Sequence, residues 1–450
     1  MTFLNLKGKV VDTGLCTSCG TCIGICPVSC ICMNENGEPQ LFDECTDCGL
    51  CLKFCPSINF DFSRFQSWNE KVEMNPFVGG YQSIYFGRTV DQEIRNKASG
   101  GGIVSALLIS ALQKGIVDGA IVVKMDEEDF ARTKVVIAEN RDEVLEAAQS
   151  KYIPAPINTV LKQVKSKKGK FALVGIPCQI HAVRKLQADG PKWYSDKIKY
   201  LIGLFCGLSL RNDFIDYVLS ILETPRKDVK EIHYRYRRNP TISSLLVVTK
   251  DGKRFFIDRE DYSFLFYLFA RKACLYCVDH TNEFADISVG DMRPFPNDSP
   301  NYKVVEPLQS VIVVRTEKGA ELLRNANDSV TLSNYDVDDL IASKLTNMID
   351  KKICSYTRMQ LRKGNGLPVP KFSQGFIKDY SLLGYKLKIC PSKAFTSSRY
   401  LYELVWLTTL NLTQNKNFVN LLSKVPLPLL KKVVGRYLRY KTWGLLERIN

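Results

Sequence analysis

Ten of the sixteen cysteines in this 450-residue chain lie between Cys16 and Cys55. Two runs, "CTSCGTCIGICP" and "CTDCGLCLKFCP", share the spacing C-x2-C-x2-C-x3-C-P. Three closely spaced thiolates from one loop can bind three irons of a cubane, while the fourth cysteine of the run lies on the next helical turn and binds the other cluster. The spacing therefore predicts two [4Fe–4S] clusters, one bound by Cys16, Cys19, Cys22 and Cys55 and the other by Cys45, Cys48, Cys51 and Cys26.

A zinc module is the alternative, because zinc sites also use paired C-x2-C units. Two matched copies that each end in Cys-Pro disfavour zinc, and the segment resembles the bacterial two-cluster ferredoxins. We expect an α+β ferredoxin domain over residues 1–62, which carries single electrons and selects no substrate. Cys30 and Cys32 fall outside the repeated pattern and are expected to be buried without a ligand role.

Six further cysteines lie outside this domain: Cys178, Cys206, Cys274, Cys277, Cys354 and Cys390. Cys178 and Cys206 each follow a strand-like apolar run, where an α/β sheet gathers its ligands. Cys274 and Cys277 form a C-x2-C pair. These four suggest a third cluster, and a mixture of core thiols with a zinc knuckle remains the alternative.

Ser99, Gly100, Gly101 and Gly102 precede a segment whose apolar residues recur at helical spacing. Glycines at the start of a helix allow a phosphate to approach the backbone amides, and the helix dipole favours negative charge there. A plain tight turn is the alternative. The segment lacks the pattern G-x-G-x-x-G, so we predict no Rossmann-type nicotinamide site.

The elements that must position these residues alternate between strand and helix from about residue 80, which predicts an α/β domain. We expect a linker at 63–79, this flavin- and cluster-binding domain at 80–345, and a basic, mostly helical C-terminal extension at 346–450. Within the extension, residues 416–450 carry many lysines and arginines against one acid, Glu447, and predict an amphipathic basic helix. Such a helix could contact an anionic membrane surface or an acidic redox partner, or could pack on the body of the protein.

Composition bounds the class of protein. With 45% hydrophobic and 24% charged residues, the chain is typical of soluble globular proteins. It has no apolar run long enough to span a membrane and no signal-peptide pattern, so we expect a cytoplasmic location. The net charge of +15 favours acidic partners, but no nucleic-acid reading module accompanies it, so no nucleic-acid partner is expected. Three histidines are too few for chemistry built on several imidazoles, and we assign His181 no role.

Five motifs resemble those of one protein family and occur in the family's order along the chain: "KASGGGIVSALLISALQKGIVDGAIVV", "SKYIPAP", "VGIPCQIHAVRKL", "GLFCG" and "CLYCVDHTNEFADISVGDM". Together they resemble the coenzyme F420 hydrogenase/dehydrogenase beta-subunit family over residues 80 to 320. The resemblance implies FAD and a [4Fe–4S] cluster in this domain. Its implied cluster ligands are Cys178, Cys206, Cys274 and Cys277, and its implied flavin-binding residues are Ser99, Gly100, Gly101, Gly102, Ser150, Lys151, Tyr152, Gly290 and Asp291.

The resemblance further implies an oxidoreductase that passes electrons between reduced coenzyme F420, as hydride to FAD, and the clusters, and then to or from a partner protein or ferredoxin. Lys151 is the expected cation for a flavin phosphate or for flavin N1. Arg235, Arg237 and Arg238 in "HYRYRRN" could bind the anionic tail of coenzyme F420, or could belong to an exposed edge strand. The alternatives are a ferredoxin-dependent FAD and iron–sulfur reductase of another substrate, such as a chlorophyll-type pigment, and a non-catalytic electron-transfer subunit.

Overall fold

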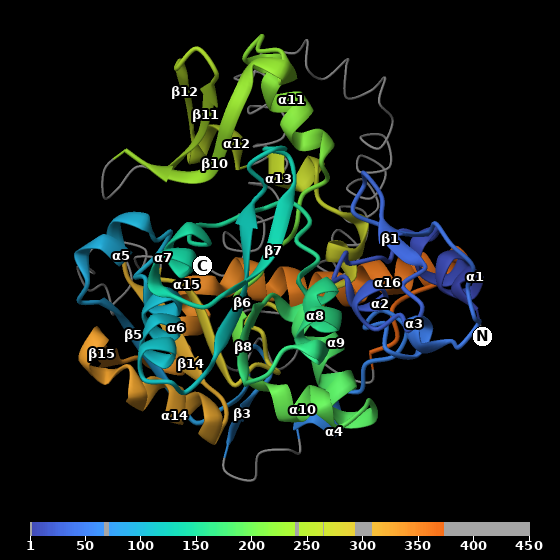
Figure 1. The fold of residues 1–450 in the computed structure, drawn as a ribbon, viewed down its shortest axis with the longest axis horizontal. Helices are drawn as coiled ribbons and strands as arrows, with labels where there is room; N and C mark the ends of the chain where they lie inside the picture. Colours follow the sequence, from blue (N-terminus) through green and yellow to red (C-terminus); the bar gives the residue numbers. More distant parts are fainter. Residues whose placement is uncertain (1, 67–71, 239–242, 264, 293–307, 373–450) are drawn as a thin grey trace, which may run out of the picture.

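A computed structural model describes residues 2–66, 72–238, 243–263, 265–292 and 308–372 (Figure 1). Its centre is a mixed sheet of eight strands in the order β15-β5-β14-β13-β9-β8-β6-β7. These strands are β5 (Ser83–Thr89), β6 (Gly119–Met125), β7 (Thr133–Ala138), β8 (Phe171–Gly175), β9 (Ile198–Leu204), β13 (Ile287–Asp291), β14 (Ser310–Val314) and β15 (Val330–Asn334). Neighbours among β6, β8, β9 and β13 are parallel, and antiparallel strands flank them on both sides. The expected α/β class is confirmed at this level, as a mixed sheet.

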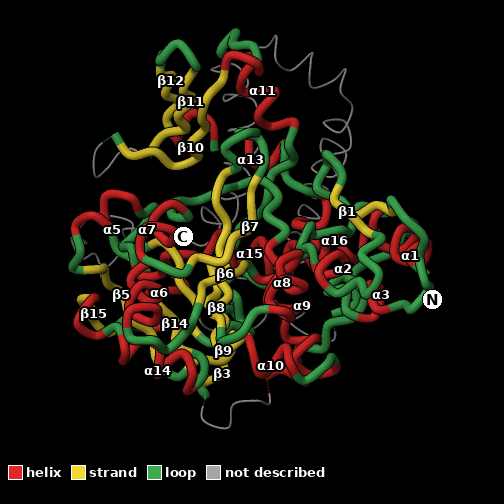
Figure 2. The backbone as a smooth tube through the Cα atoms, in the orientation of Figure 1, coloured by secondary structure: helices red, strands yellow, loops and turns green. Residues whose placement is uncertain are grey.

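The two faces of the sheet are covered by different elements (Figure 2). Side chains alternate along each strand, so Ala120 and Val122 face one core while Ile121 faces the other. The first core is closed by α6 (Ile103–Gln113), α7 (Arg141–Glu146) and α14 (Glu317–Asn325). The second is closed by α8 (Leu161–Ser166) and α9 (Pro177–Asp189), together with the N-terminal segment. Burial on both faces explains why β8 is a continuous apolar run.

The N-terminal segment consists of short elements around the cysteine loops: α1 (Phe3–Leu6), η1 (Lys7–Val11), α2 (Thr21–Gly24), β1 (Ile31–Met33), β2 (Pro39–Leu41) and α3 (Leu50–Lys53). It packs directly on the large domain, and α2 lies against α8 and α9 (Figure 1). The contact requires glycine, because a Cβ on Gly20 would lie 2.6 Å from the carbonyl oxygen of Pro156 and one on Gly24 would lie 2.0 Å from that of Asn158. The first cysteine loop is therefore held firmly against the sheet domain.

A second, smaller antiparallel sheet stands apart from the large one, at the top of Figure 1. It contains β10 (Val229–Arg237), β11 (Ser243–Thr249) and β12 (Arg254–Asp258), with β10 at one edge. It shares a core with α11 (Asp213–Ile221), α12 (Arg259–Tyr262) and α13 (Leu265–Leu268). The strand-and-helix alternation of the sequence did not separate this unit from the main sheet.

A helical path closes the described part of the chain: α15 (Val337–Ile349), the π-helix η6 (Asp350–Cys354) and α16 (Ser355–Gly364). In Figure 1 this path runs behind the sheet towards the N-terminal segment. There Arg362 donates a 2.5 Å hydrogen bond to the carbonyl oxygen of Thr13. Residue 346 lies inside α15, so no break in structure accompanies the boundary expected there. The predicted basic helix of residues 416–450 and Cys390 lie outside the described residues.

The remaining short elements are α4 (Phe62–Gln66), β3 (Glu73–Asn75), β4 (Gly79–Tyr81), α5 (Gln92–Lys97), η2 (Ile157–Val160), α10 (Trp193–Lys197), η3 (Arg226–Asp228), η4 (Lys272–Tyr276) and η5 (Asn327–Ser329). In the part of the chain that the structure covers, no helix combines the length and apolar character needed to cross a bilayer.

Candidate redox site

Four cysteines from three distant segments meet at one edge of the large sheet. Because β8 and β9 are parallel neighbours with Gly175 opposite Gly203, the residues that follow them, Cys178 and Cys206, leave the sheet at the same edge. Cys178 starts α9, where Pro177 occupies the first helical position and the side chain of Gln179 accepts a 2.8 Å bond from the N–H of Ile176. The group is completed by Cys274 and Cys277 from the η4 loop, and all four thiols interact electrostatically.

This four-cysteine group fits an iron–sulfur cluster in its donor chemistry. Burial raises the pKa of the Cys178 thiol well above its ordinary value, and the thiols around it raise it further. Burial also raises the pKa of Cys206 and of Cys277. Four buried thiolates would be strongly unfavourable without a compensating metal charge, and soft thiolates select iron–sulfur clusters, copper(I) or zinc. Among the described residues, no group of three or more Cys, His, Asp or Glu side chains is placed to hold a single metal ion.

Eight of the ten N-terminal cysteines interact in the two groups predicted from spacing. Cys22 interacts with Cys19, Cys16 and Cys55, and burial raises the pKa of Cys55 to about 12. Cys51 interacts with Cys48, Cys45 and Cys26. In each group the fourth cysteine comes from the other motif.

The cysteines outside these groups differ from one another. Cys30 is buried beside Cys26, at 3.6 Å between the sulfurs, whereas Cys32 is only half-buried and accepts a hydrogen bond from Gln40. Cys354 is buried in the core formed by the start of β4 and the C-terminal helices. Cys48, by contrast, is exposed, so the second N-terminal group reaches the protein surface.

The first N-terminal group lies beside the four-cysteine group of the sheet. Cys19 is the thiol with the largest electrostatic effect on Cys178. Asn158, which is fully buried, joins the two segments: its N–H donates to the carbonyl oxygen of Cys19 at 3.1 Å, and its Nδ2 donates to that of Gln179 at 3.1 Å and to Thr21 Oγ1 at 2.9 Å. Asn158 thus holds both segments, with its backbone N–H bound to Cys19 and its side chain bound to Thr21 and Gln179.

The predicted flavin-binding glycines lie at the edge of the sheet that also holds the four-cysteine group. Their surroundings leave no room for side chains. A Cβ on Gly101 would meet the carbonyl oxygen of Gly87 at 2.5 Å, and one on Gly100 would lie 3.1 Å from Asp291 Oδ1. The N–H of Gly101 donates to Ser310 Oγ at 2.9 Å. Gly102 has a φ of 77° and leaves the N-terminus of the eleven-residue helix α6 without a side-chain cap. An uncapped helix N-terminus behind small residues fits an anionic group.

Ser150, Lys151 and Tyr152 pack against this loop. The N–H of Ser150 donates to Ser99 Oγ at 2.9 Å, and the carbonyl oxygen of Tyr152 accepts from Leu210 at 2.6 Å. Lys151 was the expected cation, but its ammonium donates to the carbonyl oxygens of Ala147, Ala148 and Gln149 at 2.5, 2.7 and 3.1 Å, respectively. Burial lowers the pKa of Lys151 to about 7. In this arrangement Lys151 holds the turn formed by residues 147–149 that precedes it.

Two arginines of the small sheet take the place expected for Lys151. Arg235 donates to Asp291 Oδ2 at 2.5 Å and to the carbonyl oxygen of Ser99 at 3.1 Å, and Arg237 also donates to that carbonyl. Although burial opposes ionisation, Arg235 and Lys344 hold the pKa of Asp291 below its ordinary value. Burial and the neighbouring Arg235 lower the pKa of Arg237 to about 10.

These arginines leave unused donors. Nε of Arg235 and one terminal nitrogen of Arg237 are buried and have no hydrogen-bond partner among the described residues. Two adjacent guanidinium groups with unsatisfied donors beside a glycine loop fit a phosphate or diphosphate. We call Ser99–Gly102, Arg235, Arg237 and Asp291 the anion cradle.

A short segment links the anion cradle to the four-cysteine group. Phe205 packs its ring against Gly290, where a Cβ would lie 2.2 Å from the ring, and the N–H of Cys206 donates to the carbonyl oxygen of His280 at 2.9 Å. Nδ1 of His280 lies 3.1 Å from the carbonyl oxygen of Cys206, so it carries the proton, and burial lowers the pKa of His280 to about 3. The neutral ring leaves Nε2 without a hydrogen-bond partner in the described residues.

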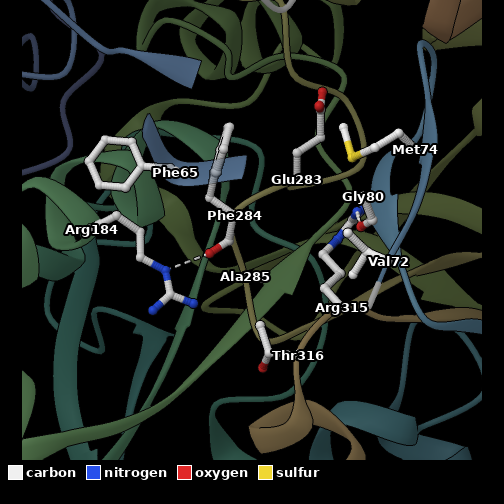
Figure 3. Close-up of a pocket in the computed structure, with 10 residues that line it drawn as sticks. All are labelled: Phe65, Val72, Met74, Gly80, Arg184, Glu283, Phe284, Ala285, Arg315 and Thr316. Atoms are coloured by element: carbon white, nitrogen blue, oxygen red, sulfur yellow. Dashed lines mark hydrogen bonds between the residues drawn. The ribbon is translucent and has the colours of Figure 1, made fainter. Parts of the chain in front are cut away.

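A separate pocket lies at the opposite edge of the sheet, lined in part by Arg184, Glu283 and Arg315 (Figure 3). Arg315 donates to Ser288, Val78, Gly80 and Thr281, and Arg184 donates to Phe284, Asp286 and Gln187. These guanidinium groups join backbone segments that are distant in sequence. We therefore assign the arginines of this pocket a structural role.

The sequence pattern indicates Arg235 and Arg237 as anion-binding candidates but assigns them to the tail of coenzyme F420 and not to the glycine loop. The contact of these arginines with Ser99 is not a local property, because it joins a distant sheet to that loop. β10 is an edge strand of its sheet, but Arg235 and Arg237 are part-buried against the Ser99 loop and not exposed as the edge-strand alternative expected. Arg238 pairs on the surface with Asp258 at 2.6 Å.

Comparison with known sequences matches the site-bearing region to one family. Residues 84–162 and 168–339 match the N-terminal and C-terminal regions of the coenzyme F420 hydrogenase/dehydrogenase beta subunit, and residues 13–29 and 42–65 match a 4Fe-4S binding domain. The coenzyme F420 hydrogenase subunit beta of Methanococcus voltae is 29% identical over 302 residues, covering 66% of this chain and 99% of that protein.

Two further relatives extend the comparison. The coenzyme F420-dependent sulfite reductase of Methanocaldococcus jannaschii is 30% identical over 333 residues, which are 70% of this chain but only 46% of that enzyme. The chain thus spans less than half of the reductase. Among solved structures, a chain of the F420-reducing [NiFe] hydrogenase complex of Methanosarcina barkeri shares the fold with a TM-score of 0.51 at 24% identity, over 66% of this chain and 98% of that chain.

Proposed function

This chain belongs to the coenzyme F420 hydrogenase/dehydrogenase beta-subunit family, and we propose that it passes electrons between reduced coenzyme F420 and its own [4Fe–4S] clusters by way of FAD. Members named for this family are subunits of oxidoreductases that use coenzyme F420, and the N-terminal segment is a 4Fe-4S binding domain. The finer assignment of FAD, of the third cluster and of their ligands is the proposal.

One observation carries it: the four-cysteine group lies between the anion cradle and the first N-terminal cysteine group. Phe205 and Cys206 connect it to Gly290 and Asp291 on one side. Cys178 faces Cys19 on the other. A flavin in the cradle would therefore have a cluster beside it, and that cluster would have the ferredoxin clusters beyond it.

The chain's own residues would bind and orient the flavin. The amides at the start of α6, Arg235 and Arg237 would hold its phosphates, and Ser150 supports the Ser99 loop through its hydrogen bond to Ser99 Oγ. When bound, FAD supplies the exchange between two-electron hydride chemistry and one-electron chemistry. The rings of Phe205 and the neutral His280, 5.6 Å apart, would limit the access of water between the cradle and the cysteines.

Cys178, Cys206, Cys274 and Cys277 would bind the third cluster, and the two N-terminal groups would bind the other two. The exposed Cys48, with Phe42 63% exposed nearby in sequence, marks the surface where a partner protein would exchange electrons. In this proposal the acceptor beyond Cys48 is a partner protein that docks at this exposed surface.

One observation favours the second candidate, a ferredoxin-dependent reductase of another substrate. All three arginines that the sequence offered to the tail of coenzyme F420 have other partners: Arg235 and Arg237 in the anion cradle, and Arg238 on Asp258. In this second candidate function, the anion cradle would still bind FAD and the cysteine groups would still bind clusters, but electrons from a ferredoxin would enter at Cys48.

Anaerobic reconstitution separates these outcomes. We expect about one FAD and about twelve irons per chain, and bleaching of the flavin on addition of reduced coenzyme F420. About eight irons would remove the third cluster from the proposal, and absence of flavin would overturn both candidates. A flavin that is inert to reduced coenzyme F420 but is reduced by ferredoxin would support the second candidate.

A further inference from the structure

Lys351 places a buried positive charge against the four-cysteine group. It is 2% exposed, and its Nζ donates to the carbonyl oxygen of Cys274 at 2.8 Å. Its charge interacts most strongly with Cys277, then with Cys274 and Cys206. Lys351 lies beyond residue 339, where the match to the family ends, so this charge comes from a segment that the family comparison does not include.

The residues around Lys351 fix its ammonium group beside the cysteine loop. Ser355 donates to the carbonyl oxygen of Cys277 at 2.9 Å, and Arg358 donates to that of Leu275 at 3.1 Å, so η6 and α16 fix the cysteine loop along its length. The adjacent Lys352 points elsewhere and pairs with Glu283. Asp350, the acid next to Lys351, pairs with Arg358 at 2.6 Å. Only Lys351 of this basic pair is directed at the thiols.

We propose that Lys351 is a positioning residue that raises the reduction potential of the third cluster. This inference rests on the proposed function, since it requires a cluster on Cys178, Cys206, Cys274 and Cys277. Adding an electron makes a cluster more negative, and a fixed ammonium nearby stabilises the reduced state more than the oxidised one. Charge and hydrogen bonds around a cluster are among the factors that set its potential. The effect is strong because few screening waters reach a buried site.

Lys185 provides a matched comparison at the first N-terminal group. It is also buried, at 8% exposed, and donates to the carbonyl oxygen of Cys55 at 2.9 Å, with electrostatic contact to Cys55 and Cys19. The two lysines thus make the same type of contact at two different cysteine groups. Each should influence the group that it touches and leave the other unchanged.

The test is an EPR-monitored redox titration of the anaerobically reconstituted full chain. In Lys351→Met we expect the midpoint of the third cluster to fall by at least the equivalent of a tenfold smaller reduction equilibrium constant, about 59 mV for one electron. The first cluster should keep its midpoint. Lys185→Met should show the reverse pattern, and Lys351→Arg should remain near the parent protein.

Iron content and the EPR signal of each variant show that the clusters are present. If Lys351→Met does not retain its third cluster, Lys351→Gln provides an uncharged donor to Cys274 and the same fall is expected. An unchanged third-cluster midpoint in a fully loaded variant would overturn the role of Lys351 alone. Absence of a third cluster in the parent protein would instead overturn the proposed function.

Discussion

Cys19, in the first cysteine loop, and Cys178, at the first turn of α9, face one another closely enough for their thiols to interact electrostatically. Asn158 joins their segments through the carbonyl oxygens of Cys19 and Gln179. This contact turns an N-terminal ferredoxin segment and a sheet domain into one continuous arrangement of cysteine groups. In the proposed function, electron exchange between clusters at these groups would not require the two parts to move.

Asn158→Ala should weaken this link without removing any ligand. The change deletes two side-chain hydrogen bonds, and we expect a loss of about 1–3 kcal/mol in stability and slower electron transfer between the third cluster and the N-terminal clusters. Thermal unfolding and stopped-flow reduction measure the two effects. Thr159→Ala is the control, because in the described part of the chain the hydroxyl of Thr159 donates only to the carbonyl oxygen of Pro156, within its own turn. Equal transfer rates in the two variants would contradict the role of Asn158.

The crossed ligation of the N-terminal clusters can be tested with paired substitutions. Cys22 and Cys55 belong to one spatial group although they come from different motifs, whereas Cys22 and Cys26 share a motif but not a group. The double variant Cys22→Ser with Cys55→Ser should lose about four irons, and Cys22→Ser with Cys26→Ser should lose about eight. Iron analysis after anaerobic reconstitution distinguishes them, and the opposite order would refute crossed ligation.

Cys206→Ser should remove the third cluster while the other two remain. Burial raises the pKa of the Cys206 thiol, and its neighbours in the group cannot hold a cubane with three thiolates as firmly as with four. We expect a loss of about four irons and of electron transfer from flavin to the N-terminal clusters. Cys32→Ser is the matched control, because Cys32 belongs to none of the three groups, and its iron content should be unchanged.

Arg237→Leu should weaken flavin binding. The change removes a charge-assisted donor that has no other hydrogen-bond partner in the described part of the chain, worth about 1.5–3 kcal/mol, or about tenfold or more in the Kd of FAD. Fluorescence titration of the apo-flavin protein measures the affinity. Arg238→Leu, which breaks only a surface pair with Asp258, should bind FAD like the parent chain. Equal affinities for the two variants would remove Arg237 from the cradle.

Arg315→Met should destabilise the fold without touching the redox site. Arg315 is 2% exposed and satisfies Ser288 and the carbonyl oxygens of Val78, Gly80 and Thr281. Leaving these groups without a donor should cost about 3 kcal/mol or more, seen as a lower midpoint of thermal unfolding. Arg324→Met removes an exposed pair with Glu317 and should change stability by less than about 1 kcal/mol.

Local patterns were sufficient for most of the elements that bear the site. The strand-like runs before Cys178 and Cys206 are β8 and β9, the segment "ADISVGD" contains β13, and the glycines precede α6, as predicted. These patterns succeed because a buried parallel strand is a continuous apolar run and an amphipathic helix repeats every three to four residues. The antiparallel pairing at both sides of the sheet and the separation of β10, β11 and β12 into a second sheet were not predicted, because strand pairing depends on partners distant in sequence.

The sequence by itself determined the chemistry of the N-terminal segment, since the ligands of each cubane come from short loops whose spacing is a local property. It also indicated which residues of the body could bind a cluster or a phosphate. Only the tertiary structure decided which of them meet. The parallel register of β8 and β9 brings Cys178 close to Cys206. The packing of α2 on η2 places Cys19 beside Cys178. Arg237 and Lys351, the cations near these groups, belong to the second sheet and to a π-helix, respectively. No local sequence pattern predicts that these two cations are buried beside the site. Their burial depends on the groups that surround them in the fold and not on their neighbours in the chain.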